Sequence, residues 1–185
     1  STMRKFPSIK TSLFTVALFG FPNVGKTTLF FRLTGSKPEI NNYAFTTKTL
    51  NVGYARYKIG KEEKKVQFID TPGTLDRLNN MNPIEKQAAL SLEHIADLVV
   101  YIFDLTEGSF PIKDQLKLYK RLKLMKKKTI VFLAKADVFD EDMQEIKNEY
   151  IKKYKALSSW EEVQEAVRDN YKDKDKVEKE KEAEK

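Results

Sequence analysis

The 185-residue sequence contains no cysteine and only one histidine and one tryptophan. Without cysteine, a disulfide-stapled scaffold and a cysteine zinc site are excluded, and a reducing compartment is favoured. No apolar run approaches the roughly 20 residues that a membrane-spanning helix needs, so we expect no membrane association. Hydrophobic residues nevertheless make up 41% of the chain. That share is enough for a buried core and excludes a wholly disordered chain.

Charge is abundant, and it is unevenly distributed. Charged residues make up 33% of the sequence, and the formal net charge is +7. The segment from position 113 to position 128 contains eight basic residues and one acidic residue, so it alone carries a net charge of +7. Apolar residues recur within and next to it at helical spacing: Ile112, Leu116, Tyr119 and Leu122. The pattern predicts an amphipathic helix whose basic face is either solvated surface or a contact for an anionic partner such as RNA.

Apolar runs and helical periodicity predict alternating strands and helices. Strands are expected over 13–19, 48–57, 64–70, 98–103 and 129–133, with a weaker sixth strand near 154–157. Helices are expected over 26–34, 83–95, 113–128, 141–154 and 160–169, and Ser158 or Ser159 is the expected cap of the last. Loops are expected over 36–47 and 71–82. This alternation is typical of a three-layer α/β fold with a mostly parallel sheet.

We expect three segments: an N-terminal extension over 1–12, one domain over 13–170 and a charged tail over 171–185. Between positions 172 and 185 only Val177 and Ala183 are uncharged. The tail therefore has almost nothing to bury, and we expect disorder or a frayed helix there.

The strongest motif lies between the first predicted strand and the first predicted helix. Gly20–Thr27 reads GFPNVGKT and matches G-x-x-x-x-G-K-[ST], a loop whose backbone amides surround phosphate groups at a helix start. In this motif Lys26 reaches the β- and γ-phosphates, and the Thr27 hydroxyl is a ligand of Mg²⁺. The expected nucleotide contacts come from Asn23, Val24, Gly25, Lys26, Thr27 and Thr28.

Two further segments are candidates for sensing the γ-phosphate. Asp70-Thr-Pro-Gly73 ends the third predicted strand, where Asp70 is expected to hold Mg²⁺ through water and the Gly73 amide to meet the γ-phosphate. The loop before the second strand carries Thr46 and Thr47, and we favour Thr47 over Thr46 as a Mg²⁺ ligand present only with the γ-phosphate. The predicted catalytic residues are therefore Lys26, Thr47 and Gly73, and the predicted metal ligands are Thr27, Thr47 and Asp70.

A candidate guanine reader follows the fifth predicted strand. Ala134-Lys-Ala-Asp137 is similar to N-K-x-D, in which the Asp accepts hydrogen bonds from guanine N1–H and N2–H. Lys135 is expected to lay its stem along the base, and Ala134 stands where Asn is usual. A backbone amide near the base is expected from Lys155–Leu157, with Ala156 as the candidate. Since Asp137 suits guanine, a P-loop ATPase or kinase is disfavoured.

Together these segments resemble one known family. GFPNVGKTTL, KPEI-x-x-Y-x-FTT-x-x-x-NVG, FIDTPG-x-LDR and IEKQAALSL are similar to the G domain of the nucleolar GTP-binding protein family, the Nog group of the Obg–HflX class. The resemblance covers about residues 4–137. It implies a P-loop NTPase G domain with a six-stranded, mostly parallel sheet, one antiparallel strand and helices on both faces. Family members carry a helical domain before the G domain, so this chain is expected to be either an excised G domain or a reduced member.

The resemblance also implies a function: a GTP switch that binds ribosomal RNA and ribosomal proteins during assembly of the large ribosomal subunit. We expect a monomer that binds GTP and GDP with Mg²⁺ and is located in the cytoplasm, or in the nucleolus of a eukaryote. Intrinsic hydrolysis should be slow, because Thr74 follows Gly73 where many GTPases have a water-positioning Gln. K⁺ is a candidate second cofactor, because Asn23 resembles a K⁺-ligating Asn. The alternative is a guanine-nucleotide-dependent binding module with negligible hydrolysis.

Overall fold

The computed structural model describes residues 9–10, 12–35, 38–42, 49–71, 83, 91–92 and 94–185. The labelled elements, in chain order, are β1 (Phe14–Phe19), α2 (Lys26–Thr34), β2 (Glu39–Asn42), β3 (Thr49–Ile59), β4 (Glu62–Asp70), β5 (Leu98–Phe103), α4 (Ile112–Leu124), β6 (Thr129–Leu133), the 3₁₀ turn η2 (Ala136–Val138), α5 (Glu141–Tyr154) and α6 (Trp160–Ala183). The helix predicted over 83–95 falls mostly outside the described residues, although those described between 83 and 95 are helical.

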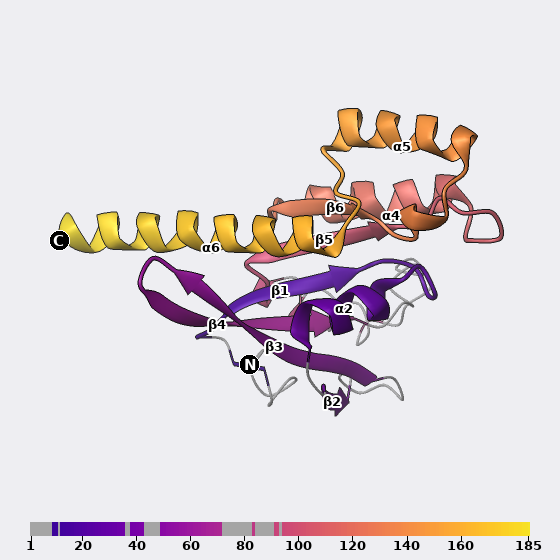
Figure 1. The fold of residues 1–185 in the computed structure, drawn as a ribbon. Coiled ribbons are helices and arrows are strands. Elements are labelled where there is room, and N and C mark those ends of the chain that lie inside the picture. Colours follow the sequence, from indigo (N-terminus) through magenta and orange to yellow (C-terminus); the bar gives the residue numbers. More distant parts are fainter. Residues whose placement is uncertain are drawn as a thin grey trace.

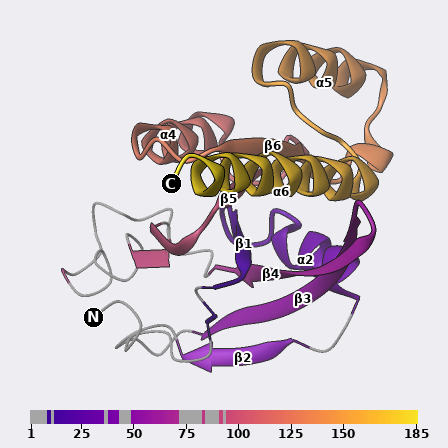
Figure 2. The same ribbon diagram turned by 90° about the vertical axis from the view of Figure 1, so that its left-hand side faces the viewer.

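The six strands form one sheet in the order β2-β3-β4-β1-β5-β6. β1 runs parallel to both β4 and β5, and β5 runs parallel to β6. β3 pairs antiparallel with both β2 and β4, so it alone runs against the other five strands. The prediction of a mostly parallel sheet with one antiparallel strand is confirmed. Figure 2 shows β2 at the edge of the sheet away from α4 and α5.

The sixth strand is not the one that the sequence predicts. β2 lies inside the segment predicted as the loop 36–47. The predicted strand near 154–157 is reduced to one parallel bridge, between Phe132 and Leu157. Lys155 has a left-handed φ of 54°, which ends α5 and prevents an extended run at this point.

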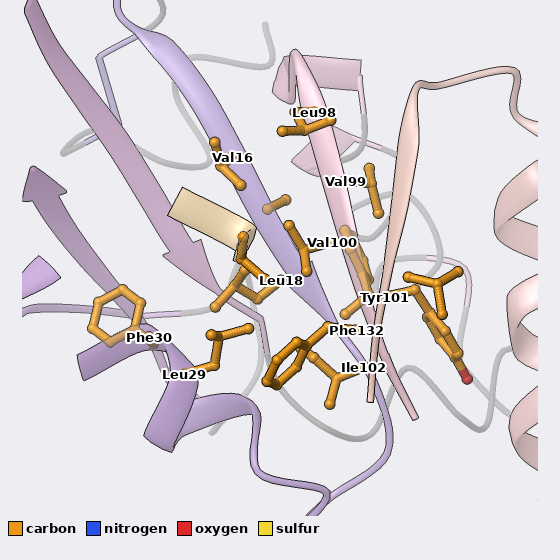
Figure 3. Close-up of a cluster of buried hydrophobic side chains, with 14 of the residues drawn as sticks. Val16, Leu18, Leu29, Phe30, Leu98, Val99, Val100, Tyr101, Ile102 and Phe132 are labelled. Carbon is orange, nitrogen blue, oxygen red and sulfur yellow. The ribbon is translucent and has the colours of Figure 1, made fainter. Parts of the chain in front are cut away.

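The core is built around the two central parallel strands. All six residues of β1 and all six of β5 are buried, as continuous apolar runs in a covered parallel sheet should be. Figure 3 shows Leu29 of α2 on the same side of the sheet as Leu18, while Tyr101 points away from them. Successive strand residues face opposite sides, so β5 contributes to the core on both faces of the sheet.

The helices cover both faces of the sheet, as a three-layer fold requires. On one face α2 and α6 contact each other, and Arg168 of α6 lies over the Tyr57 ring of β3. On the other face the Phe103 ring of β5 lies 5.7 Å from Tyr119 of α4 and 5.6 Å from Tyr150 of α5, measured between ring centroids. These aromatic contacts hold α4 to the sheet. The basic helix predicted over 113–128 is shorter in the structure: it ends at Leu124, and Lys126, which follows, has a left-handed φ of 57°.

The last helix is longer than the sequence predicts. α6 continues to Ala183 instead of ending near Asp169. The Tyr171 and Phe14 rings lie 5.2 Å apart, and Lys174 Nζ lies 2.7 Å from Asp97 Oδ1, so this part of α6 is attached to the sheet. Its last turns are exposed and extend past the sheet (Figure 1). None of the described helices has the length and apolar character that crossing a membrane requires.

Candidate functional site

The phosphate loop lies at the carboxyl end of β1, between that strand and α2. A Cβ placed on Gly20 would lie 2.9 Å from Val24 Cγ2 and 3.1 Å from the Ile102 carbonyl oxygen, so the loop passes too close for a side chain there. Gly25 has a φ of 95°, which favours glycine directly before the first helical residue. Val24 is fully buried, whereas Asn23 is exposed. The buried Val24 therefore attaches the loop to the core, while the turn at Asn23 is open to solvent.

Three predicted site residues, Lys26, Thr27 and Asp70, are connected by hydrogen bonds at the end of this loop. Lys26 Nζ donates to Asp70 Oδ1 and to the Thr71 carbonyl oxygen, each at 2.5 Å. The Thr27 hydroxyl donates to Asp70 Oδ2 at 3.0 Å. Lys26 and Asp70 are both buried, with 8% and 4% of their surface exposed. An ammonium and a hydroxyl from α2 and a carboxylate from β4 thus come together, and all three belong to predicted site residues.

The oxygen atoms of this cluster fit Mg²⁺. Mg²⁺ prefers hard oxygen ligands and is commonly held by one or two carboxylates together with substrate phosphates. Thr27 Oγ1 and Asp70 Oδ2 supply such oxygens at 3.0 Å from each other. In the part of the chain that the structure describes, no group of three or more His, Cys, Asp or Glu could form an all-protein metal site. Two protein oxygens leave the other Mg²⁺ positions to phosphate oxygens and water, so Thr27 and Asp70 suit a metal shared with a nucleotide.

Asn51 is a contact of this cluster that sequence reasoning missed. It lies on β3 as the register partner of Asp70 on β4, and its Nδ2 lies 3.4 Å from Asp70 Oδ2. It is the Asn of the NVG segment quoted above, but that motif does not place it against Asp70, because the contact depends on the antiparallel register. The candidate switch residues Thr46, Thr47 and Gly73 lie outside the described residues.

The candidate guanine reader follows β6 at the same edge of the sheet. Lys135 has a φ of 57°, and its Nζ lies 3.3 Å from the Asn23 carbonyl oxygen of the phosphate loop. Asp137 follows in η2 and is exposed. Ala134 is buried directly against Gly25, because a Cβ on Gly25 would lie 3.0 Å from that of Ala134. The candidate guanine reader and the phosphate loop are therefore in contact.

Asp104, directly after β5, is a second residue that the sequence did not single out. Its side chain is fully buried, and its Oδ2 accepts from Lys135 Nζ at 2.6 Å. Its Oδ1 accepts from the Thr106 amide at 2.9 Å and from the Thr106 hydroxyl. Burial opposes ionisation of this carboxyl, but the hydrogen bonds from Lys135, Thr106 and Ser109 outweigh it, so the pKa of Asp104 lies below its ordinary value.

Ala156 lies one residue before the bridge to β6. It is buried, and the next residue, Leu157, donates to the Val131 carbonyl oxygen while its own oxygen accepts from Leu133 N–H. Because this pairing is parallel, the chain reaches the carboxyl edge of the sheet only after Leu157. Ser158 and Ser159 are the residues that follow there. The Ser159 hydroxyl accepts from the Glu162 amide and caps α6.

Comparison with known proteins places this geometry in context. Residues 15–135 match the family described as 50S ribosome-binding GTPase. The chain is 44% identical over 143 residues to an uncharacterized protein of Methanocaldococcus jannaschii, which covers 76% of this chain and 38% of that protein. It is 38% identical over 153 residues to nucleolar GTP-binding protein 1 of Eremothecium gossypii, which covers 80% of this chain and 23% of that protein.

A solved structure extends the likeness to the fold. A Plasmodium falciparum protein assigned as nucleolar GTP-binding protein 1 aligns with a TM-score of 0.68 at 23% identity, covering 95% of this chain and 96% of that one. At this identity the likeness supports the fold alone. The chain spans less than two fifths of the length of the two relatives above, so it corresponds to one part of them.

Proposed function

The chain belongs to the 50S ribosome-binding GTPase family, and on that premise we propose that it is a slowly hydrolysing GTP switch in assembly of the large ribosomal subunit. The observation that carries this proposal is the convergence of Lys26, Thr27 and Asp70 at the end of a glycine-containing phosphate loop. The relatives named nucleolar GTP-binding protein 1 support the link to the ribosome. We expect the protein to act as a monomer in the cytoplasm, or in the nucleolus of a eukaryote.

In this function the residues have distinct tasks. Lys26 neutralises the β- and γ-phosphates, while Thr27 and Asp70 hold Mg²⁺, which supplies charge compensation when bound. Asp137 accepts from the guanine N1–H and N2–H, and Lys135 lies along the base. Thr47 and Gly73 remain the proposed contacts to the metal and the γ-phosphate. Since Ala156 precedes the bridge at Leu157, the backbone amide of Ser158 is a better-placed candidate for the base.

Slow hydrolysis follows from the residues next to Gly73. Thr74 and Leu75 stand where many GTPases have a Gln that orients the attacking water, and neither has the long amide side chain of Gln. Asn23, exposed at the turn of the loop, is the residue proposed to ligate K⁺. A cation there would stabilise charge that develops in the transition state. Equal hydrolysis rates in KCl and NaCl would remove K⁺ from the proposal.

Asp137 provides the sharpest test of guanine binding. Asp137→Asn replaces a double acceptor with an amide that can donate, so it should favour xanthine, whose C2 carbonyl accepts a hydrogen bond. We expect GDP affinity to fall by at least about tenfold, while xanthosine diphosphate affinity rises. Asp140→Asn, at the exposed cap of α5, is the matched control. Unchanged GDP affinity in Asp137→Asn would contradict the assigned reader.

Hydrolysis requires a separate measurement. Single-turnover phosphate release from bound GTP should be slow with the protein alone and faster with large ribosomal subunits. No release under either condition, despite tight GTP binding, would instead support the alternative of a nucleotide-dependent binding module.

The basic helix is the proposed contact for ribosomal RNA. Lys113, Lys117, Lys120 and Lys123 are all exposed on α4. Lys127, by contrast, donates to the His94 and Ala96 carbonyl oxygens at 3.1 and 2.9 Å, so its role is at least partly structural. The four exposed lysines can therefore be changed with less risk to the fold than Lys127. Ribosomal proteins are further proposed partners of this surface.

Changing these four lysines to Gln should weaken binding to isolated large-subunit ribosomal RNA. The slope of log affinity against log salt should fall by up to about four, because each lost phosphate contact releases about one counterion fewer. The control changes Lys172, Lys176, Lys181 and Lys185 of the exposed end of the chain, which removes the same charge elsewhere. An equal loss of RNA affinity in both variants would show that only the net charge matters, and not the position of the lysines on α4.

A further inference from the structure

A buried carboxylate at the end of β5 is not used by any motif of the candidate site. The Asp104 side chain has no exposed surface, yet both of its oxygens have partners: Lys135 on Oδ2 and Thr106 on Oδ1. Burying a charge is unfavourable unless it is paired and hydrogen-bonded. The pairing with Lys135 therefore accounts for how a carboxylate can be placed here.

Lys135 connects three segments that are distant in sequence. Its ammonium lies 2.6 Å from Asp104 Oδ2 and 3.3 Å from the Asn23 carbonyl oxygen, so the ends of β5 and β6 meet the phosphate loop at one atom. Ala134 also touches this loop, at Gly25, but a methyl group cannot hydrogen-bond. Lys135 is thus the side chain through which this turn makes a polar contact with the loop.

We propose that Asp104 is a positioning residue for guanine recognition, because its buried carboxylate holds Lys135 against the phosphate loop and so orients the turn that carries Asp137. This inference rests on the proposed function. Asp104 would thus hold the turn after β6 against the phosphate loop through Lys135, which the methyl group of Ala134 cannot do by hydrogen bonding.

The carboxylate is not needed to hold its own backbone. The Asp104 amide donates to Gln115 Oε1 at 2.9 Å, and Gln115 Nε2 donates to the Asp104 carbonyl oxygen at 2.8 Å. An Asn at position 104 would keep these bonds, and its carbonyl oxygen could still accept from Thr106. Its amide would face the Lys135 ammonium, donor against donor. Asp104→Asn therefore removes the bond to Lys135 with little change in shape.

The experiment measures GDP and ADP affinity in the full chain. Asp104→Asn should weaken GDP binding about tenfold, as expected for loss of a charge-assisted hydrogen bond, and leave the weak ADP binding unchanged. Asp97→Asn is the matched control, because it alters a carboxylate–lysine pair with Lys174 at the opposite edge of the sheet. Thr106→Val is a second control that leaves the Lys135 contact in place. Neither control should change the ratio of ADP to GDP dissociation constants.

Rescue distinguishes positioning from general damage. In the Asp104→Asn background, Ala134→Asn restores a polar side chain beside the phosphate loop and should recover most of the GDP affinity. Equal loss of GDP and ADP affinity in Asp104→Asn, or no loss at all, would overturn the inference. If the unaltered protein fails to bind GDP, the proposed function itself is wrong, which separates that failure from failure of this inference.

Discussion

At the residue scale, Asp70 has the most side-chain hydrogen bonds among the described site residues that the sequence predicts. Its two carboxylate oxygens receive hydrogen bonds from Lys26 of α2, Thr27 of the same helix and Asn51 of β3. Any Mg²⁺ bound at Thr27 would compete with the Lys26 ammonium for this single carboxylate. The affinity of a phosphate ligand and that of the metal should therefore depend on each other through Asp70.

Asp70→Asn tests this dependence. The amide retains an oxygen acceptor for Thr27 but loses the negative charge that attracts Mg²⁺. We expect the gain in GTP affinity on adding Mg²⁺ to fall by about tenfold or more, with little change in affinity when EDTA is present. A GTP titration with and without Mg²⁺ measures both. An undiminished Mg²⁺ effect would show that Asp70 is not among the proposed metal ligands.

The lowered pKa of Asp104 also predicts that the free energy of unfolding depends on pH. Its pKa is lower in the folded chain than its ordinary value of 3.8. Its stabilising contribution is therefore complete above 3.8 and is lost as the pH falls through the folded value. Asp104→Asn should lower the free energy of unfolding by about 1–2 kcal/mol at pH 7, and this difference should shrink below pH 3.8. Urea unfolding at pH 7 and at pH 3 checks the sign.

At the element scale, the sequence predicts elements well where apolar residues follow a clear pattern, as in buried β5 and in the partly buried helix α5, and poorly where they do not. The apolar run of β5 and the helices α2 and α5 lie where predicted. β2 was missed because it is a four-residue edge strand whose Ile40 is 70% exposed, so it shows no apolar pattern. The end of α6 was missed because its outer turns bury little and consist mostly of charged residues, among them the pair Asp175 and Lys179.

The candidate site divides in the same way. The phosphate loop and Asp70 were predictable because both belong to motifs of fixed spacing. Asp104 and Asn51 were not, since their contacts join residues 31 and 19 positions apart through the sheet. The position of Ala156 relative to the edge of the sheet likewise depended on the single bridge at Leu157.

Gly53 of β3 is where the packing of α2 can be tested. A Cβ there would lie 2.8 Å from Phe30 Cζ and 2.8 Å from Thr34 Cγ2. Gly53→Ala should lower the free energy of unfolding by about 1–3 kcal/mol through overpacking, measured by urea titration. Adding Thr34→Ser removes one of the two clashing atoms and should recover part of the loss. Gly60→Ala, which is strained by its φ but has open space, should gain nothing from Thr34→Ser.

At the scale of the whole molecule, α6 is unevenly attached along its length. Val163 and Val167 near its start are fully buried, and Lys174 bonds to Asp97. Beyond that contact every side chain except that of Asp175 is exposed. Its attachment to the sheet therefore depends on roughly its first half.

Removing residues 178–185 should therefore change the free energy of unfolding by no more than about 0.5 kcal/mol and leave GDP affinity unchanged. Exposed ion pairs such as Lys174 with Glu178 contribute little. Val163→Ala is the control at the other end of the helix and should cost about 1–3 kcal/mol. A loss on truncation as large as that of Val163→Ala would show that the outer turns contribute to the fold.

The basic helix has a kinetic consequence for the molecule as a whole. The segment 113–128 accounts for the entire net charge of +7, and six of its eight basic side chains are exposed, while the rest of the chain is balanced. The electric field of a polyanion therefore exerts a torque on the unevenly charged protein. The molecule would turn to present α4 before contact occurs, which accelerates productive encounters. Added salt should then slow association far more than it speeds dissociation.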